Sequence, residues 1–177
     1  MIKQVFISHS SKDQSAAQEI CRLLESQGIR CWIAVRDVLP GTFYAEEIIK
    51  ALEGSAALLL VCTRNTSEST HVRNEVERVF SHGKLIFPVR IEDVGLGRTF
   101  EYFMGASQWF DAWKEPLNLA MVRLAESIRK VLGETDAGRP DVPVYLPSNS
   151  DEKLSEKLPL QRNPNNLPAQ SSSANSF

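Results

Sequence analysis

The chain of 177 residues lacks the features that place a protein in a membrane, on nucleic acid or in a secretory pathway. No apolar run approaches the ~20 residues that a membrane span needs. The formal net charge is −2, so no basic excess attracts nucleic acid or an anionic membrane. Residues 1–7 turn polar too soon for a signal peptide. We therefore expect a cytoplasmic protein with neither nucleic acid nor membrane as a direct partner.

Cysteine is scarce as well. Cys21, Cys31 and Cys62 make an odd number without metal-ligand spacing, and each lies in an apolar pattern, so we expect reduced thiols in the core. The three histidines lack the paired spacing of a metal site. No GxxxxGK[ST] phosphate loop occurs, and Gly95 and Gly97 lack the third glycine and following helix of a dinucleotide fingerprint. The sequence thus predicts no metal and no bound cofactor.

Two familiar sites are also disfavoured. Ser8, His9 and Asp13 supply the residue types of a hydrolase triad, but neighbours in one loop rarely reach triad geometry. A response-regulator receiver would carry acidic residues just after the first strand and an aspartate after the third. Serine and histidine follow the first strand here, and Thr63 follows the third. Phosphoryl transfer to an aspartate is therefore not expected.

What the chain does contain is a regular alternation of short apolar runs and helical patterns. The apolar runs predict strands over residues 5–7, 29–35, 56–62, 85–91 and 108–110. Apolar residues at helical spacing predict helices over residues 16–24, 45–52, 72–80 and 117–132, with a short helix near residues 102–103. This alternation indicates an α/β domain. We expect a flavodoxin-like, doubly wound sheet of five parallel strands in the order 2-1-3-4-5, with helices on both faces.

The composition changes after Gly133. Residues 134–177 hold six of the nine prolines together with many serines and asparagines. Such a segment buries too little apolar surface to offset the entropy lost on ordering. We predict a folded domain over residues 1–133 and a linker or disordered tail over residues 134–177, which tethers another domain or partner.

Two carboxylates on the predicted helix at 72–80 point in different directions. At about 100° per residue, Val72 and Val76 belong to one apolar stripe, and Glu77 lies roughly 100° or more from it. Glu75 lies only about 60° from Val72, at the edge of the buried face. A half-buried carboxylate is either a functional acid or a boundary residue paired with Arg78 or a neighbouring chain. Helix geometry alone leaves both interpretations open.

A sheet of this order binds ligands beyond the carboxyl ends of its strands, at the switch between strands 1 and 3. Three segments meet there: the loop 8–12, the loop 35–43 and the start of the helix that carries Glu75. Backbone amides of the loops and of the helix N-terminus suit an anionic ligand such as a pyrophosphate. Arg36 is expected to add positive charge at this crevice.

Several segments, each weak alone, together resemble a known family. Residues 5–13 (VFISHSSKD) resemble the opening box of Toll/interleukin-1 receptor (TIR) domains, and residues 72–77 (VRNEVE) match their helix C signature. The strand CWIA with Arg36-Asp37 and Pro40-Gly41 is similar to the strand and "BB loop" of bacterial members. FPVRI, EYF and QWFD match later elements in the right order. The resemblance covers roughly residues 1–132 and agrees with the expected fold.

The resemblance implies an enzyme acting on NAD+. Many bacterial TIR domains cleave the nicotinamide–ribose bond, releasing ADP-ribose or a cyclised variant, and the family's catalytic acid falls at Glu75. The resemblance also places Ser8 and His9 beside the adenine and phosphates, and Phe43 near the site. His71 stands where the family often has a tryptophan that stacks near the nicotinamide. A single carboxylate suffices, because nicotinamide leaves as a neutral molecule and needs no general acid.

The resemblance further implies a bacterial defence role against phage and assembly of copies through the loop 36–43, with NAD+ as substrate. The alternative is a non-enzymatic TIR module that scaffolds partners through the same loop. His71 in place of tryptophan favours the scaffold, and the intact helix around Glu75 favours the enzyme. Two residues also have plainer interpretations: Trp32 belongs to the core, and Phe43 can instead staple the helix that follows it.

Overall fold

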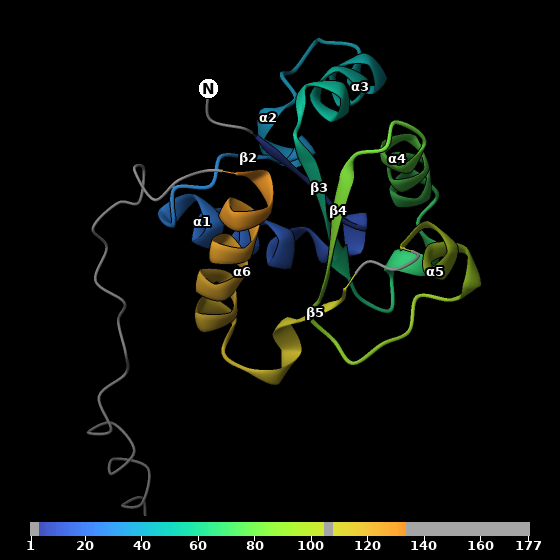
Figure 1. Ribbon diagram of the computed structural model, residues 1–177. Helices are drawn as coiled ribbons and strands as arrows, with labels where there is room; N and C mark the ends of the chain where they lie inside the picture. The colour runs from blue at the N-terminus through green and yellow to red at the C-terminus, as the bar shows by residue number, and fades with distance from the viewer. Residues whose placement is uncertain (1–3, 105–107, 134–177) are drawn as a thin grey trace, which may run out of the picture. The chain divides into compact units, whose positions relative to one another are not determined.

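The computed structural model describes residues 4–104 and 108–133. Its sheet contains five parallel strands in the order β2-β1-β3-β4-β5, so the predicted α/β architecture and strand order are confirmed (Figure 1). The strands are β1 (Val5–Ser8), β2 (Cys31–Trp32), β3 (Ala57–Cys62), β4 (Leu85–Arg90) and β5 (Phe110–Asp111). The predicted tail over residues 134–177 lies outside the described residues.

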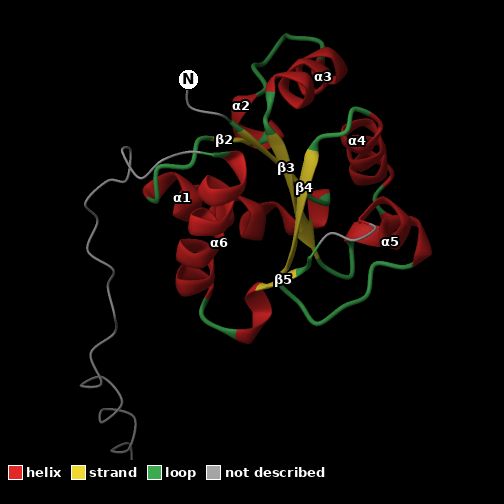
Figure 2. Cartoon of the chain, viewed as in Figure 1, coloured by secondary structure: helices red, strands yellow, loops and turns green. Residues whose placement is uncertain are grey.

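Helices cover both faces of the sheet (Figure 2). They are α1 (Gln14–Ser26), α2 (Ala34–Asp37), α3 (Tyr44–Gly54), α4 (Thr70–Ser81), α5 (Arg98–Met104) and α6 (Leu117–Leu132). The buried residues of α1 and α6 share one core cluster, and those of α3, α4 and α5 share the other. The sheet therefore separates two cores. Within the described residues, no helix combines the length and apolar character needed to cross a bilayer.

Strand β3 is buried along its whole length because it lies between these two cores. Leu58 and Leu60 pack with α4, whereas Leu59 and Val61 pack with α1 and α6. Alternate residues of a strand point to opposite faces, which explains why its sequence is apolar throughout rather than alternating. The same rule orients Ser8 of β1 toward the α4 face.

Strand β2 is shorter than predicted, because residues 34–37 form α2 instead of continuing the strand and loop. The carboxylate of Asp37 accepts a hydrogen bond from the backbone N–H of Ile33 at 2.8 Å. That N–H is thereby unavailable to a strand ladder and marks the start of the helix. β5 is also displaced, to residues 110–111.

Pro88 lies in the part of β4 that pairs with β3 alone. Pro88 aligns with Leu60 of β3 on one side, but β5 aligns only with Val89 and Arg90 on the other. Proline has no backbone N–H to donate. Pro88 therefore lies where the ladder of β4 is incomplete.

Candidate functional site

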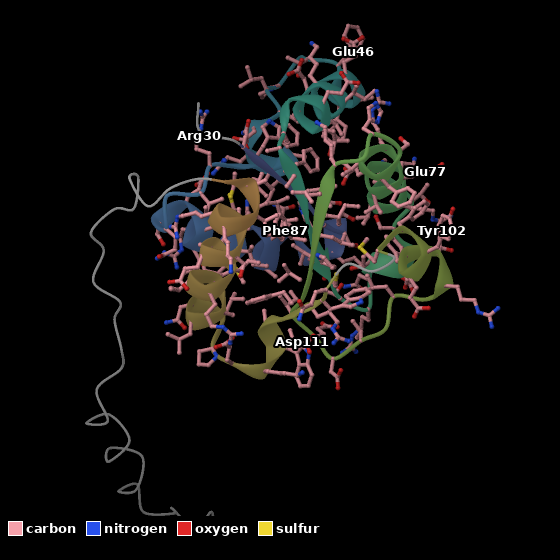
Figure 3. All side chains as sticks on the ribbon, in the orientation of Figure 1. Arg30, Glu46, Glu77, Phe87, Tyr102 and Asp111 are labelled. Atoms are coloured by element: carbon pink, nitrogen blue, oxygen red, sulfur yellow. The ribbon has the colours of Figure 1, made fainter. Side chains whose placement is uncertain are left out.

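The carboxylate of Glu75 on α4 meets the end of β1. Ser8, the last residue of that strand, is buried, and its hydroxyl donates a hydrogen bond to Oε2 of Glu75 at 2.5 Å. Glu75 is half-buried, whereas Glu77 is exposed on the outer side of α4 (Figure 3). The prediction that Glu75 lies at the edge of the buried face and Glu77 faces solvent is thus confirmed.

Burial raises the pKa of Glu75 to about 7, and the hydrogen bond from Ser8 opposes this rise. Both the neutral acid and the carboxylate are therefore populated near neutral pH. Arg78 does not neutralise the acid, because its Nη2 donates to Oε1 of Glu53 at 2.6 Å. The Arg78 pairing considered for Glu75 is absent, and a buried acid with a displaced pKa is typical of a functional group.

Replacing Ser8 with alanine is expected to raise the pKa of Glu75 further, by roughly 0.5 to 1 pH unit, because the carboxylate loses a hydrogen bond that favours its charged form. A ¹³C NMR titration of the glutamate carboxyl groups in the free protein measures this value. Ser10→Ala is the matched control, since Ser10 is also buried but caps the turn at Ser11–Asp13. An unchanged pKa in Ser8→Ala would contradict the assigned contact.

A cleft of about 290 Å³ opens beside Glu75, between α3 and α4. One wall is largely apolar and comes from α3, and the other is polar and comes from α4. The lining residues are Tyr44, Ala45, Ile48, Ile49 and Leu52, with His71, Asn74, Glu75 and Arg78. Burial and the negative charge of Glu75 raise the pKa of Tyr44. An apolar wall facing a few polar groups is the usual character of a small-molecule site.

The predicted site residues are only partly brought together. His71 lines the cleft one turn before Glu75, and Ser8 contacts the carboxylate directly. His9 follows Ser8 and is half-buried, and this burial lowers its pKa. The side chain of Phe43 is 79% exposed and is not among the residues that line the cleft.

Arg36 lies elsewhere, contrary to the expectation that it would charge the crevice. Its guanidinium donates to the carboxylate of Glu25 on α1 at 2.8 Å and to that of Asp37 at 2.8 Å. It also donates to the backbone carbonyl of Cys31 at 2.9 Å. Two nearby carboxylates thus neutralise Arg36 on the α1 side of β2, so its charge is not directed toward Glu75.

Asp13 holds the loop after β1 against the loop after β3. Its carboxylate accepts hydrogen bonds from Thr63 Oγ1 at 2.6 Å and from Asn65 Nδ2 at 2.7 Å. Lys12 and Glu68 add an exposed ion pair at 3.1 Å. The sequence placed Asp13 only among the residue types of a hydrolase triad, whereas in the structure its carboxylate joins the two loops and fixes the segment carrying His9.

The cleft also contains residues that sequence reasoning missed. Tyr44, Asn74 and Arg78 line it, and the only signal in the chain was their position: Tyr44 follows Phe43, and the other two flank Glu75 at positions −1 and +3. Periodicity alone does not show which helix packs opposite α4. Tyr44, Asn74 and Arg78 line a common cleft only because α3 packs against α4 in the folded chain.

The family model described as "TIR domain" matches residues 5–125, which is more than half of the chain. The chain belongs to the TIR domain family. No curated protein matches the sequence. Among solved structures, the TIR domain of the Toll-related receptor TRR-2 from Hydra magnipapillata superposes with a TM-score of 0.60 at 22% identity, covering 71% of this chain and 97% of that one.

Two more distant structures also match this TIR domain. The TIR domains of the activated Roq1 resistosome, which recognises the pathogen effector XopQ, give a TM-score of 0.47 at 17% identity, covering 70% of this chain and 84% of that chain. A metazoan TIR-STING receptor from C. gigas gives 0.44 at 22% identity, covering 72% and 39%. At these identities the likeness to solved structures concerns the fold alone.

Proposed function

We propose that this TIR domain cleaves the bond between nicotinamide and ribose in NAD+, with Glu75 as the catalytic carboxylate. The observation that carries the proposal is one half-buried acid, with its pKa raised to about 7, at a cleft between two helices. NAD+ and water give nicotinamide, ADP-ribose and a proton. Attack by the adenine ring instead of water gives a cyclic product.

The chemistry needs few protein groups. As the C–N bond breaks, nicotinamide leaves neutral and positive charge develops on the ribose. A carboxylate beside the ribose stabilises that charge, and low local polarity strengthens the interaction. The hydrogen bond from Ser8 occupies Oε2 of Glu75, which leaves Oε1 to face the ribose. Ser8 therefore serves to orient the acid.

The rest of the cleft suits the leaving base. Ile48 and Tyr44 offer an apolar and aromatic wall for the nicotinamide ring. Arg78 lines the cleft, and its Nε is buried without a hydrogen-bond acceptor among the described residues, so a rotation of the guanidinium would let it donate to the carboxamide oxygen. His71 provides a smaller stacking surface than the tryptophan frequent in the family.

Chromatography of NAD+ after incubation with the purified chain tests the proposal and identifies the product. Loss of NAD+ with release of nicotinamide is expected, and the second product separates hydrolysis from cyclisation. No loss at any protein concentration would overturn the proposal. Within the same proposal, NAD+ consumption makes the protein a candidate effector of bacterial defence against phage.

We also propose that copies assemble through the loop 36–43. Two large apolar side chains of this loop are mostly exposed, with 67% of Leu39 and 79% of Phe43 accessible. Exposed apolar side chains of this size, close together on one loop, are typical of an interaction surface. Assembly would place a neighbour's loop against the cleft and shield it from water.

Replacing Leu39 and Phe43 with serine is expected to reduce NAD+ cleavage roughly tenfold at low micromolar protein, because anchors at the centre of an interface carry most of its energy. The wild-type rate should rise faster than linearly with protein concentration. Tyr102→Ser is the control, since Tyr102 is 72% exposed on α5, outside the loop. A strictly linear wild-type rate would contradict assembly.

The second candidate function is a non-enzymatic module that binds partners through the same loop. The exposed side chains of Leu39 and Phe43 favour it, as does His71 in place of tryptophan. This function predicts no NAD+ loss at any concentration. It also predicts that Pro40→His abolishes partner binding through the loop. For binding between copies of this chain, sedimentation of the full chain measures the loss.

A further inference from the structure

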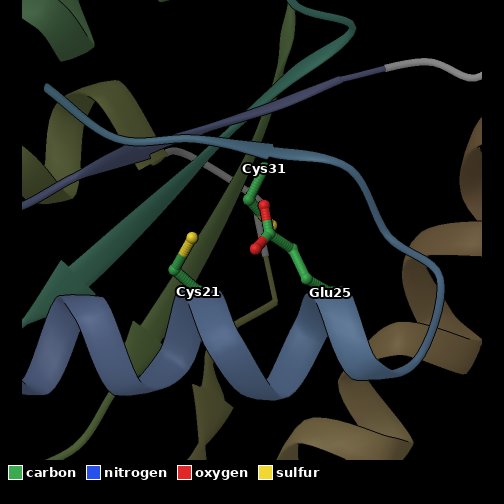
Figure 4. Close-up of side chains that lie close together, drawn as sticks. All are labelled: Cys21, Glu25 and Cys31. Carbon is green, nitrogen blue, oxygen red and sulfur yellow. The ribbon is translucent and has the colours of Figure 1, made fainter. Parts of the chain in front are cut away.

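Two buried thiols meet between α1 and β2 (Figure 4). They belong to the core cluster of α1 and α6, whereas the cleft is lined by α3 and α4, whose buried residues form the other cluster. Cys21 lies on α1 and Cys31 on β2, and both are free cysteines. Their sulfur atoms and a carboxylate oxygen of Glu25 all lie within 4.8 Å of one another. The apolar pattern of the sequence predicted that these cysteines are buried, but it did not predict that they are neighbours.

Arg36 covers this pair from the surface. Its Nη1 donates to Sγ of Cys21 at 3.4 Å and to the carboxylate of Glu25 at 2.8 Å. The side chains of Arg36 and Glu25 are 43% and 36% exposed. Both side chains contact Cys21 or its neighbour from the surface, so their rotation would open a path by which a small solute reaches Cys21.

The two thiols differ in acidity. The hydrogen bond from Cys31 lowers the pKa of Cys21, and Arg36 acts in the same direction, against burial and the charges of Glu25 and Asp37. The hydrogen bond to Cys21 and burial raise the pKa of Cys31. Cys21 is therefore the thiol that ionises first, with a guanidinium beside it and a second thiol within reach.

A metal ion fits this cluster poorly. Zinc in structural sites takes four ligands, and the cluster offers two thiols and one carboxylate. The guanidinium of Arg36 already stands where a cation would have to approach Cys21 and Glu25. Redox chemistry between the two sulfur atoms is the chemistry that this arrangement favours.

We propose that Cys21 and Cys31 form a modification site at which a peroxide produces a reversible disulfide. The thiolate of Cys21 attacks a peroxide oxygen, the O–O bond breaks, and a sulfenic acid forms while the leaving hydroxide takes up a proton to become water. The thiol of Cys31 then attacks the Cys21 sulfur and releases a second water. Two thiols lose two electrons, and hydrogen peroxide gains them.

The disulfide would link α1 to the edge strand β2 and close a short chain segment, residues 21–31. Closing a segment of this size restricts the unfolded chain and stabilises the fold. The oxidised protein should therefore melt at a higher temperature, by roughly 5 °C. Arg36, at the start of the loop 36–43, would lose its contact with the Cys21 thiol and keep Glu25 and Asp37.

The test uses the full chain, purified reduced and exposed to a small excess of hydrogen peroxide. Denaturation with iodoacetamide then blocks the remaining thiols, and peptide mass spectrometry locates them. We expect linked peptides carrying Cys21 and Cys31, two hydrogens lighter than the reduced pair and separated by dithiothreitol. Cys62 is the internal control, because it is buried in the other core and burial raises its pKa to about 12.

Two variants assign the roles. Cys31→Ser should leave a sulfenic acid on Cys21 that dimedone traps, and Arg36→Gln should slow oxidation of the pair roughly tenfold by removing the adjacent cation. Should a variant fold poorly, the wild-type peptide map still decides. Alkylation of both cysteines after peroxide would overturn the proposal. So would irreversible oxidation of Cys21 alone, or one Zn²⁺ retained per chain that protects both thiols.

Discussion

Replacing Glu75 with glutamine is expected to lower the turnover of NAD+ at least 10³-fold while the fold persists. The amide carries no charge, so it cannot stabilise the cation that develops on the ribose. Its carbonyl oxygen can still accept the hydrogen bond from Ser8, which in the wild type joins Ser8 Oγ to Glu75 Oε2 at 2.5 Å. Nicotinamide release, followed by chromatography at saturating NAD+, measures the loss.

Glu77→Gln is the matched control, because Glu77 lies two residues away on the same helix but is exposed. It removes the same charge from α4 without touching the cleft, so turnover should stay within about twofold of the wild type. Circular dichroism of both variants checks the fold. Equal turnover in wild type and Glu75→Gln would remove Glu75 from the mechanism.

The same substitution is expected to stabilise the protein above pH 7. The carboxyl group of Glu75 has a pKa of about 7 in the folded chain against an ordinary value of 4.5 for a glutamate in water. Between these two values the folded state holds a proton that the unfolded state has released, so the free energy of unfolding falls as pH rises. The fall amounts to about 3 kcal/mol, starting near pH 4.5 and complete above pH 7.

Glutamine does not titrate, so Glu75→Gln should match the wild type near pH 4.5 and exceed its free energy of unfolding by about 3 kcal/mol at pH 8. Urea unfolding of both proteins at the two pH values measures the difference. Glu77→Gln should show no comparable dependence on pH. A stability difference that is the same at both pH values would mean that burial of Glu75 does not displace its pKa.

The turnover and the pH-dependent stability of Glu75→Gln together would show how burial of this carboxyl group affects activity and folding. In the proposed mechanism the ionised form of Glu75 stabilises the ribose cation, so NAD+ cleavage should increase as pH rises through about 7. Over the same interval the fold loses stability. A functional acid in low-polarity surroundings gains activity and loses stability in this way in general.

The sequence predicts the fold well because its signals are local. The unbroken apolar run of β3 reflects burial on two faces, and the 100° step of a helix separates Glu75 from Glu77. The end of β2 was not predictable in this way. It depends on the hydrogen bond between Ile33 and Asp37, which exists only after the chain has turned into α2.

The candidate site was less predictable, because side-chain partners are chosen in three dimensions. Arg36 was expected near a phosphate, but the folded chain brings it to Glu25, 11 residues earlier. Tyr44 gives no signal in the sequence, because its role depends on how α3 packs against α4. Likewise, the contact between Cys21 and Cys31 follows from the approach of α1 to β2, which no spacing rule indicates.

The separation of Ser8 and Glu75 by 67 residues has a consequence for protein synthesis. A ribosome delivers Ser8 early, but the acid gains its surroundings only after β3 and α4 have emerged and docked on β1. Contacts of such long range form late in folding. If Glu75 is the catalytic acid proposed above, a nascent or truncated chain that ends before α4 would be inactive, and NAD+ cleavage would begin only after α4 has packed on β1.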